Sequence, residues 1–433
     1  AGVLLVRGDA PLTDAALTGR LREIFQTYHA DYVFEDGYPA GFAPELLDSA
    51  ILDQLIALAR QHNMAYTREG LFPVLQKDIN IFDIETELAP VDLRPYRCVP
   101  VCNSRRNFLP AKRLYEEGAR DAKTCAELLP GHEEWIRSLP AFFSIQITET
   151  CPQSCSYCPY PLMRGDPRIP GASMKTETFY RIIDEICAFA EDAVIDLSLW
   201  GEPALHPDIE ELVGYILAKD ELTLLLETSG IGRKADALGR ILKAAADAGD
   251  KRIYSPFEGP RLQFIVSLDA QTKELYEKLR GAGFEEAEAF VGKLLAEYPS
   301  GTHIQAVRMR ENEAELEDFY RRWKKTAGHV IIQGYESFAG SLPDRRVCDI
   351  TPVKRFACRH LARDICVLLD GRVPVCKYAL SKDTHEPLVI AGNILDSGIE
   401  GVWQSMQGFF EQNCSAAYPD FCRDCNEYYT YHA

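Results

Sequence analysis

Thr148–Tyr160 reads TETCPQSCSYCPY, and this stretch decides how the rest of the chain is interpreted. It places Cys151, Cys155 and Cys158 within eight residues, directly after the apolar run AFFSIQI at 141–147. A structural zinc site needs four protein ligands, and no His or fourth Cys stands beside these three. An iron–sulfur cubane is normally held by four thiolates, so three thiolates leave one iron open to a non-protein ligand. The spacing therefore indicates a metal centre with one free position; a zinc loop that takes a distant fourth ligand is the alternative.

The chain has 433 residues, 14 of them cysteine, and its 47 basic and 65 acidic side chains give a net charge of −18. Because this length exceeds one ordinary core, two or three domains are expected. Clustered cysteines in a long chain without a signal peptide indicate metal ligands in a reducing cytoplasm rather than a disulfide scaffold. The acidic balance disfavours nucleic acid as a partner, and no apolar run reaches the about 20 residues that span a membrane. We therefore expect a cytoplasmic protein that binds neither nucleic acid nor membrane.

Residues 139–340 alternate strand and helix patterns. Six apolar strand candidates lie at 142–147, 194–199, 222–227, 262–268, 303–308 and 329–333. Amphipathic helix candidates lie between them at 176–190, 208–218, 234–248, 284–298 and 313–326. Strand–helix units in series predict a parallel sheet with right-handed crossovers, either doubly wound or an incomplete barrel. In both folds ligands bind at the C-terminal ends of the strands, and the three cysteines follow the first of them.

The flanking regions lack this alternation. In residues 1–138, the run GVLLV at 2–6 predicts a buried strand, and the helix after it has Thr13 or Asp14 as its cap. Residues 341–433 hold seven of the 14 cysteines and few helical patterns, as expected of a small domain that a metal holds together. Within it, Asp370–Gly371 predicts a hairpin turn between ICVLL and VPVC, which would bring Cys376 near Cys358.

The three-cysteine loop after the first predicted strand resembles the hallmark of the radical SAM superfamily. In that family the three cysteines hold a [4Fe–4S] cluster whose open iron chelates S-adenosylmethionine. An electron from the cluster then cleaves the sulfonium, and the resulting 5′-deoxyadenosyl radical abstracts a hydrogen from the substrate. The resemblance covers roughly half of the chain. It implies a partial (β/α)6 barrel and an electron donor of the flavodoxin or ferredoxin type.

Further segments resemble the cofactor-binding parts of the same family. An aromatic residue, here Tyr157, commonly precedes the third cysteine and would touch adenine. LSLWGEPALHP resembles the Gly-Glu-Pro motif that meets the methionine ammonium, with Trp200 in place of the usual leading glycine. LLLETSG and FIVSLDAQTKELYEKLRG resemble the third and fourth strand ends, although a plain turn with a helix cap at Asp269 or Thr272, and a surface position for Arg280, are the alternatives. The cofactor-binding residues implied by the resemblance are Tyr157, Gly201, Glu202, Pro203, Glu227, Ser229, Ser267 and Asp269.

The C-terminal cysteines resemble the auxiliary-cluster extension of many radical SAM enzymes, the SPASM domain and its shorter relative, the twitch domain. A full SPASM domain has three more cysteines after its Cys-x2-Cys pair, but the next ligand position here is Tyr431. One auxiliary [4Fe–4S] cluster is therefore expected, with the ligands Cys358, Cys376, Cys422 and Cys425. A four-thiolate zinc site is the alternative, and Cys348 or Cys414 could replace one ligand, whereas Cys366 is expected to be a buried apolar side chain. The closing segments also resemble SPASM-bearing proteins of spirochaetes.

The segment RGDAPLTDAALTGRLREIF and the residues after it resemble the later half of cytidylyltransferase-like sugar-nucleotide enzymes. The glycine-rich phosphate loop of those enzymes would precede the first residue of this sequence. Asp9 matches a metal-binding Asp of that family, but without the loop we expect residues 1–138 to be a non-catalytic scaffold or docking module. Cys98 and Cys102 are expected to be structural.

Together these features predict a radical SAM enzyme with one auxiliary cluster in residues 341–433. We expect it to oxidise or otherwise modify a peptide or protein side chain, or a small molecule such as a sugar or alcohol. Oxidation requires a base that removes a proton, and the unranked candidates are Asp349, Asp364 and Glu427. A non-catalytic metal-binding adaptor with a zinc-loaded C-terminal domain is the alternative function.

Overall fold

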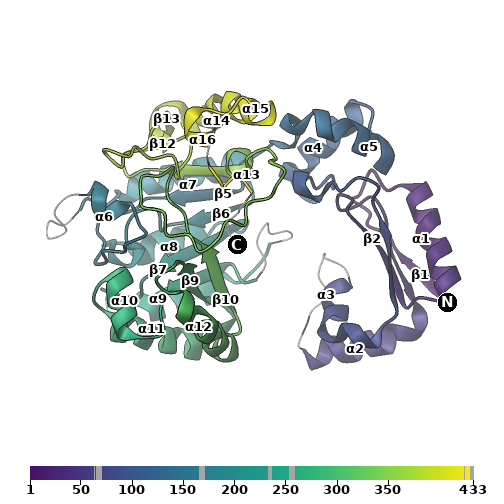
Figure 1. Ribbon diagram of the computed structural model, residues 1–433, viewed down its shortest axis with the longest axis horizontal. Coiled ribbons are helices and arrows are strands. Elements are labelled where there is room, and N and C mark those ends of the chain that lie inside the picture. Colours follow the sequence, from purple (N-terminus) through teal and green to yellow (C-terminus); the bar gives the residue numbers. More distant parts are fainter. Residues whose placement is uncertain are drawn as a thin grey trace. The chain divides into compact units, whose positions relative to one another are not determined.

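The computed structural model describes residues 1–62, 64, 71–164, 171–232, 237–252, 259–423 and 425–429 (Figure 1). Its contacts divide the chain into two compact units, Ala1–Ser138 and Leu139–Ala433. In the ranges described, no helix combines the length and hydropathy needed to cross a bilayer. Tyr431, and residues 234–236 of one predicted helix, lie outside the described residues.

The first unit is built on a four-stranded mixed sheet. Its strands are β1 (Gly2–Leu5), β2 (Tyr32–Asp36), β3 (Glu45–Asp48) and β4 (Ile84–Leu88), in the order β1-β3-β2-β4. Only β2 and β4 pair in parallel. The helices are α1 (Ala15–Tyr28), α2 (Leu52–Gln61), α3 (Phe72–Leu75), α4 (Arg105–Glu116) and α5 (Ala122–Leu128).

Two predictions for this unit have different outcomes. The helix capped by Asp14 is confirmed, because the Asp14 carboxylate accepts hydrogen bonds from the N–H groups of Ala16 and Leu17 at the start of α1. The first strand forms as predicted, but the prediction that it is buried is wrong. β1 pairs with β3 alone at the sheet edge, and Val3 is 40% exposed.

The second unit is built on a seven-stranded parallel sheet in the order β10-β9-β8-β7-β6-β5-β11. The six strands of the repeating part are β5 (Phe142–Ile145), β6 (Ala193–Asp196), β7 (Leu222–Thr228), β8 (Leu262–Ser267), β9 (Thr302–Arg308) and β10 (Val330–Gly334). The helices between them are α6 (Tyr160–Met163), α7 (Thr176–Ala190), α8 (Ile209–Leu217), α9 (Ala237–Ala248), α10 (Lys273–Arg280), α11 (Phe284–Glu297) and α12 (Glu313–Thr326). The six predicted strands and the helices between them are confirmed, and so is the fold class, a partial barrel with an α/β N-terminal region and a small C-terminal region.

Burial explains the composition of these strands. β7 is buried at six of its seven positions, as expected where helices cover one face of a parallel sheet and side chains fill the other. One apolar layer takes a residue from each of four successive strands: Phe142, Val194, Leu225 and Ile265. This layer forms a rigid apolar floor beneath the strand ends, where the polar residues of the site begin.

The C-terminal segment adds the seventh strand. Its elements are α13 (Arg359–Arg363), β11 (Asp364–Val367), β12 (Arg372–Pro374), β13 (Ile390–Asn393), α14 (Ile394–Ser405), α15 (Gln407–Cys414) and α16 (Asp420–Arg423). The turn predicted at Asp370–Gly371 forms, with the Gly371 N–H donating to the Leu368 carbonyl at 2.9 Å. The Leu368 N–H also donates to the Arg372 carbonyl at 2.8 Å, so the chain reverses as predicted, and Cys376 and Cys358 line one small cavity. Beyond this turn the strands have other partners, because β11 pairs in parallel with β5 and β12 pairs with β13. β11 thus forms the edge of the sheet beside β5, and its side chains Ile365, Cys366 and Val367 are buried there.

Candidate active site and metal centres

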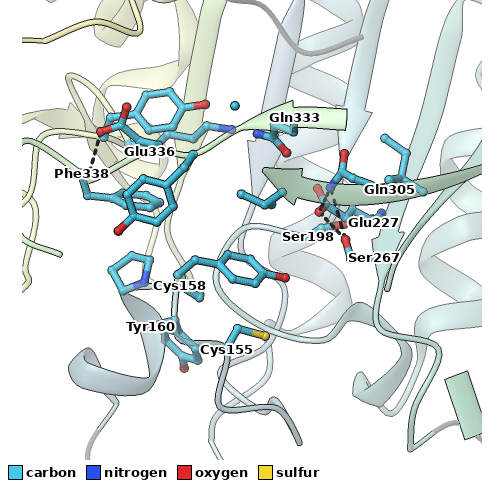
Figure 2. A pocket seen from close by; sticks show the side chains of 18 of the residues that line it. Cys155, Cys158, Tyr160, Ser198, Glu227, Ser267, Gln305, Gln333, Glu336 and Phe338 are labelled. Carbon is cyan, nitrogen blue, oxygen red and sulfur yellow. Dashed lines mark hydrogen bonds between the residues drawn. The ribbon is translucent and has the colours of Figure 1, made fainter. Parts of the chain in front are cut away.

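A cavity of about 530 Å³ opens at the C-terminal ends of the barrel strands (Figure 2). Phe142, Leu225 and Ile265 of the apolar layer contribute to its lining. Its rim comes from the three-cysteine loop, from the segment after β6, and from residues of the C-terminal segment. The position agrees with the rule that ligands of such folds bind beyond the carboxyl ends of the strands.

The three-cysteine loop is fixed by backbone hydrogen bonds. The N–H of Ser154 donates to the carbonyl of Arg280 at 3.0 Å, and the N–H of Ser156 donates to that of Leu279 at 2.7 Å. The carbonyl of Thr150 accepts from the N–H of Glu202 at 2.8 Å. The loop is thus attached to the end of α10 on one side and to the Gly-Glu-Pro segment on the other.

Cys151, Cys155 and Cys158 all line this cavity. Burial raises the pKa of Cys151 to about 12 and also raises the pKa values of Cys155 and Cys158. Without a cation the three thiols would therefore keep their protons, whereas a bound metal deprotonates its thiol ligands outright. Three partly buried soft donors at an open cavity fit an iron–sulfur cluster with one unoccupied iron position.

The backbone of the Gly-Glu-Pro segment shows how Trp200 can stand at a position where the family has a glycine. Trp200, which stands where the family has a glycine, adopts a left-handed φ of 45°, a conformation that favours glycine. The Gln146 side chain donates to the Trp200 carbonyl at 3.0 Å and helps to hold it there. At Gly201, an added Cβ would collide with the carbonyl oxygen of Thr148. Trp200 therefore has the backbone conformation that a glycine would adopt at this position, although its side chain departs from the family pattern.

Glu202 joins this segment to the end of β7. Its carboxylate accepts from the Thr228 hydroxyl at 2.6 Å and from the N–H and hydroxyl of Ser229 at 2.8 and 2.6 Å. Glu202 is only 3% exposed, so these bonds compensate the cost of burying its charge. Glu202 and Ser229 line the cavity together with Gly201, and their contact with a cofactor stays a prediction. Pro203 begins a short 3-10 turn behind them.

The buried side chains of Asp269 and Arg280 form a polar group with Tyr157 of the cysteine loop. An Arg280 Nη1 lies 2.6 Å from Asp269 Oδ2, and the Tyr157 hydroxyl donates to the same oxygen at 2.5 Å. Arg280 also donates to the Tyr157 hydroxyl. Burial alone would lower the pKa of Arg280, but the nearby Cys155 and Tyr157 raise it far above its usual value. Arg280 is 4% exposed, so the surface alternative for this residue is wrong.

Asp269 is fully buried and is absent from the described lining of the cavity, whereas Ser267 and Tyr157 belong to it. Its second oxygen accepts from the N–H of Val307 at 2.7 Å, and its backbone has a left-handed φ of 64°. The structure thus places Asp269 behind the site, where it holds Arg280 and Tyr157.

A second polar group lies at the ends of β6 to β9. Glu227 accepts from the Ser267 hydroxyl at 3.0 Å and from the Gln305 amide at 2.7 Å, as Figure 2 shows. Burial raises the pKa values of Glu227 and Asp196, and the charge of Lys377 opposes both shifts. Asp196, Gln305 and Lys377 were not predicted, because isolated polar residues at strand ends carry no motif.

The four C-terminal cysteines predicted as auxiliary ligands meet at one small cavity of about 20 Å³. They are Cys358, Cys376, Cys422 and Cys425. Burial raises the pKa of Cys422 to about 11 and that of Cys425 to about 12. Arg355 fixes the Cys-x2-Cys segment by donating to the carbonyls of Cys422 at 2.8 Å and Arg423 at 3.2 Å. Two buried and two partly buried thiols around one cavity fit a closed metal centre.

Within the described ranges, no three His, Cys, Asp or Glu side chains are arranged around a single-ion position. The four C-terminal thiols are assigned to one centre because all four line the same small cavity. Of the other cysteines, Cys366 is buried as predicted, whereas Cys348 is exposed at the rim of the larger cavity. Cys414 is partly buried and absent from both described linings.

The three candidate bases are placed differently. Asp349 is exposed, and Asp364 pairs with His360 at 2.6 Å, while Glu427 lines both cavities. Glu336, which sequence reasoning missed, lies beside Glu427, and burial followed by the Glu427 carboxylate raises its pKa to about 8. No motif surrounds Glu336, so only the fold brings the two acids together.

Comparisons with known proteins agree with this geometry. Residues 145–322 match the family model described as the radical SAM superfamily, and residues 358–426 match SPASM, described as an iron–sulfur cluster-binding domain. A protein of Treponema pallidum (strain Nichols), described as uncharacterized, is 35% identical over 370 residues, which cover 83% of this chain and 98% of the relative.

Similar solved structures have low sequence identity. Streptococcus suis SuiB bound to the precursor peptide SuiA is 14% identical with a TM-score of 0.47, and 86% of this chain and 87% of SuiB are covered. anSMEcpe with bound AdoMet is 14% identical with a TM-score of 0.46, over 67% of this chain and 84% of that one. BtrN in complex with AdoMet and 2-DOIA is 16% identical with a TM-score of 0.40, over 67% and 94%.

Proposed function

The chain belongs to the radical SAM superfamily and carries a SPASM iron–sulfur domain, and on this premise we propose that it cleaves S-adenosylmethionine reductively and abstracts a hydrogen from a substrate in the cavity. Membership implies a [4Fe–4S] cluster, S-adenosylmethionine and auxiliary iron–sulfur binding. The substrate, the site residues and the outcome of the reaction are our proposals.

The observation that carries the proposal is the placement of Cys151, Cys155 and Cys158 at a cavity beyond the strand ends, beside the Gly-Glu-Pro segment. These three thiols would hold the cluster and leave one iron for the cofactor. When bound, the cluster supplies the electron that splits the sulfonium and yields a 5′-deoxyadenosyl radical. The backbone around Gly201 and the polar ends of β7 and β8 would orient the cofactor.

The protein's own residues enclose and align the reactants. The apolar floor of Phe142, Leu225 and Ile265 excludes water from the base of the cavity, which would protect a reactive radical from side reactions. Asp269 and Arg280 bind the hydroxyl of Tyr157, a residue of the loop itself, and so fix the position of its ring at the cavity wall. We assign the adenine contact to Tyr157, and the ribose and methionine contacts to Glu227, Ser229 and Ser267.

The second centre would take part in the same reaction. Tyr378 and Glu427 line both the large cavity and the cavity of the four C-terminal cysteines, so one substrate can lie within reach of both. We propose that Cys358, Cys376, Cys422 and Cys425 hold one auxiliary [4Fe–4S] cluster. Of the candidate bases, Glu427 has the placement for removing a proton from a substrate in this cavity, and an external flavodoxin- or ferredoxin-type protein would supply electrons.

Anaerobic purification followed by iron analysis and product detection tests the proposal. The parent protein should be brown, contain about eight iron atoms per chain from two cubanes, and release 5′-deoxyadenosine with dithionite and S-adenosylmethionine. Cys155→Ala should abolish that product and leave about four iron atoms. Cys102→Ala, at an exposed position of the first unit, is the matched control and should match the parent. A colourless, zinc-loaded protein without this product would contradict the proposal and favour the adaptor.

A further inference from the structure

The lining of the large cavity contains more acidic than basic side chains. The three arginines of its lining are each paired with a carboxylate that the lining does not include, namely Arg280 with Asp269 at 2.6 Å, Arg308 with Glu313 at 2.6 Å and Arg346 with Asp344 at 3.0 Å. Lys377 is the remaining basic side chain in the described lining. The lining also contains the acids Asp196, Glu202, Glu227, Glu336 and Glu427, so it is acidic on balance.

The acids form two groups on opposite sides of the cavity. In Figure 2, Glu227 lies with Ser267 and Gln305 on one side, and Glu336 lies near Phe338 on the other. Lys377 acts on the first group, because its charge opposes the raised pKa values of Asp196 and Glu227. The first group also lies at the strand ends to which we assign the cofactor, which leaves the Glu336 side for the substrate.

Glu336 has an oxygen that lacks a donor. Its Oε1 accepts from the N–H of Phe338 at 2.5 Å, but its Oε2 is buried and accepts no hydrogen bond in the described structure. The neighbouring acid is Glu427, so this oxygen lies beside a second carboxyl group. A cation with several N–H donors placed between the two acids would supply the missing donor and offset the repulsion between two ionised carboxylates.

The walls around this position strengthen such a contact. The ring of Phe338 lies 5.7 Å from that of Tyr378, and both rings line the cavity beside the two acids. Aromatic walls displace water, and a charge-assisted hydrogen bond is stronger where the local dielectric is low. A primary ammonium, which has three donors and one compact charge, fits these requirements.

We infer that the substrate carries a primary ammonium group that binds between Glu336 and Glu427, with its reacting carbon turned toward the cysteine loop. The inference rests on the proposed function, because it assigns this side of the cavity to the substrate. Two sources share the chemistry: an amino sugar or related small amine, and the amine of a peptide. Glu336 is a specificity-determining residue in this account.

Calorimetric binding to the anaerobic, full-length holoenzyme with S-adenosylmethionine tests the inference. Two matched pairs serve as probes: methyl glucosaminide against methyl glucoside, and acetyl-Gly-Lys-Gly-amide against the same peptide with norleucine. At least one amine should bind about tenfold or more tightly than its neutral partner, and the pair that responds identifies the source. Glu336→Gln should remove most of that preference, whereas the exposed Glu386→Gln should keep it. Absence of preference in both pairs, or its persistence in Glu336→Gln, overturns the inference.

A change in the probe tests the same contact without changing the protein. Trimethylation of the preferred amine keeps its charge and removes its N–H donors, so affinity should fall about tenfold or more. Equal affinity for the trimethylated amine would overturn the assigned hydrogen bonds even if Glu336→Gln failed to fold. Release of 5′-deoxyadenosine by the parent is measured separately, without probes. Failure of that release would contradict the proposed function and leave the binding result as an independent outcome.

Discussion

At the scale of single residues, Arg280 links the barrel to the cysteine loop. Its guanidinium pairs with the fully buried Asp269, and its carbonyl accepts from the N–H of Ser154 in the loop. A buried charge that loses its partner costs far more than an exposed one, because nothing then compensates its lost hydration. Arg280 therefore contributes to both the stability and the alignment of the site.

We predict that Arg280→Met lowers the free energy of unfolding by about 3–5 kcal/mol, because it leaves Asp269 buried and unpaired. Adding Asp269→Asn to that variant should restore part of the loss, since the remaining charge is removed. Arg321→Met, which breaks an ion pair whose arginine side chain is 74% exposed, is the control and should cost less than about 1 kcal/mol. Urea unfolding measures all three; equal losses in Arg280→Met and Arg321→Met would contradict the role of Arg280.

The sequence alone predicted some residues of the site and missed others. The cysteines and the Gly-Glu-Pro segment carry fixed local spacings, which can be read without a structure. Glu336 and Lys377 have no such spacing, and their relevance comes from neighbours far away in the chain. For Arg280 the sequence left a surface position open, because burial of an arginine depends on a partner that folding supplies.

At the scale of elements, the Gly-Glu-Pro segment and the cysteine loop must approach closely. Gly201 allows this contact, because any side chain there would meet the backbone of Thr148. We predict that Gly201→Ala slows S-adenosylmethionine cleavage about a hundredfold by displacing the cofactor, with the iron content unchanged. Gly239→Ala in α9, where an added Cβ has open space, is the control. Equal cleavage rates in the two variants would contradict this close approach.

The β8–β9 pair supplies a pH-dependent prediction. Burial, and then the charge of His329, lowers the pKa of His303 to about 4 from 6.5. The unfolded chain therefore takes up this proton first, so stability is retained above pH 6.5 and lost as the pH falls toward 4. Because the ring is only partly buried, we expect the loss to be about 1–2 kcal/mol. Acid unfolding should be less steep in His303→Gln than in the parent or in the exposed His62→Gln; identical profiles would contradict the assignment.

The elements of the barrel were predictable because helices and parallel strands leave regular apolar patterns. α7 and α12 begin and end at the residues that periodicity indicated. Which strands pair with each other is harder to predict from the sequence, because an apolar strand can pair with any open edge of a sheet. The turn after β11 was predicted and forms, but the sequence did not indicate that β11 pairs in parallel with β5.

At the scale of the whole molecule, the second unit contains all the residues of both proposed centres. The residues that line the two cavities all belong to Leu139–Ala433, and the first unit is a separate compact sheet and its helices. The role of residues 1–138 as a non-catalytic, cytidylyltransferase-like scaffold stays a prediction, because the matching family models cover only residues 145–322 and 358–426. Length predicted two or three domains, and the contacts divide the chain into two units. The functional prediction came from the cysteine spacings and the strand ends together.

Electron paramagnetic resonance of the dithionite-reduced holoenzyme, recorded with and without S-adenosylmethionine, tests the central claim most directly. A cluster held by Cys151, Cys155 and Cys158 has one iron that the cofactor can bind, so its signal should change when the cofactor is added. Cys155→Ala should leave only the signal of the four-cysteine centre, and that signal should not respond. Identical spectra of the parent protein with and without the cofactor would contradict the account.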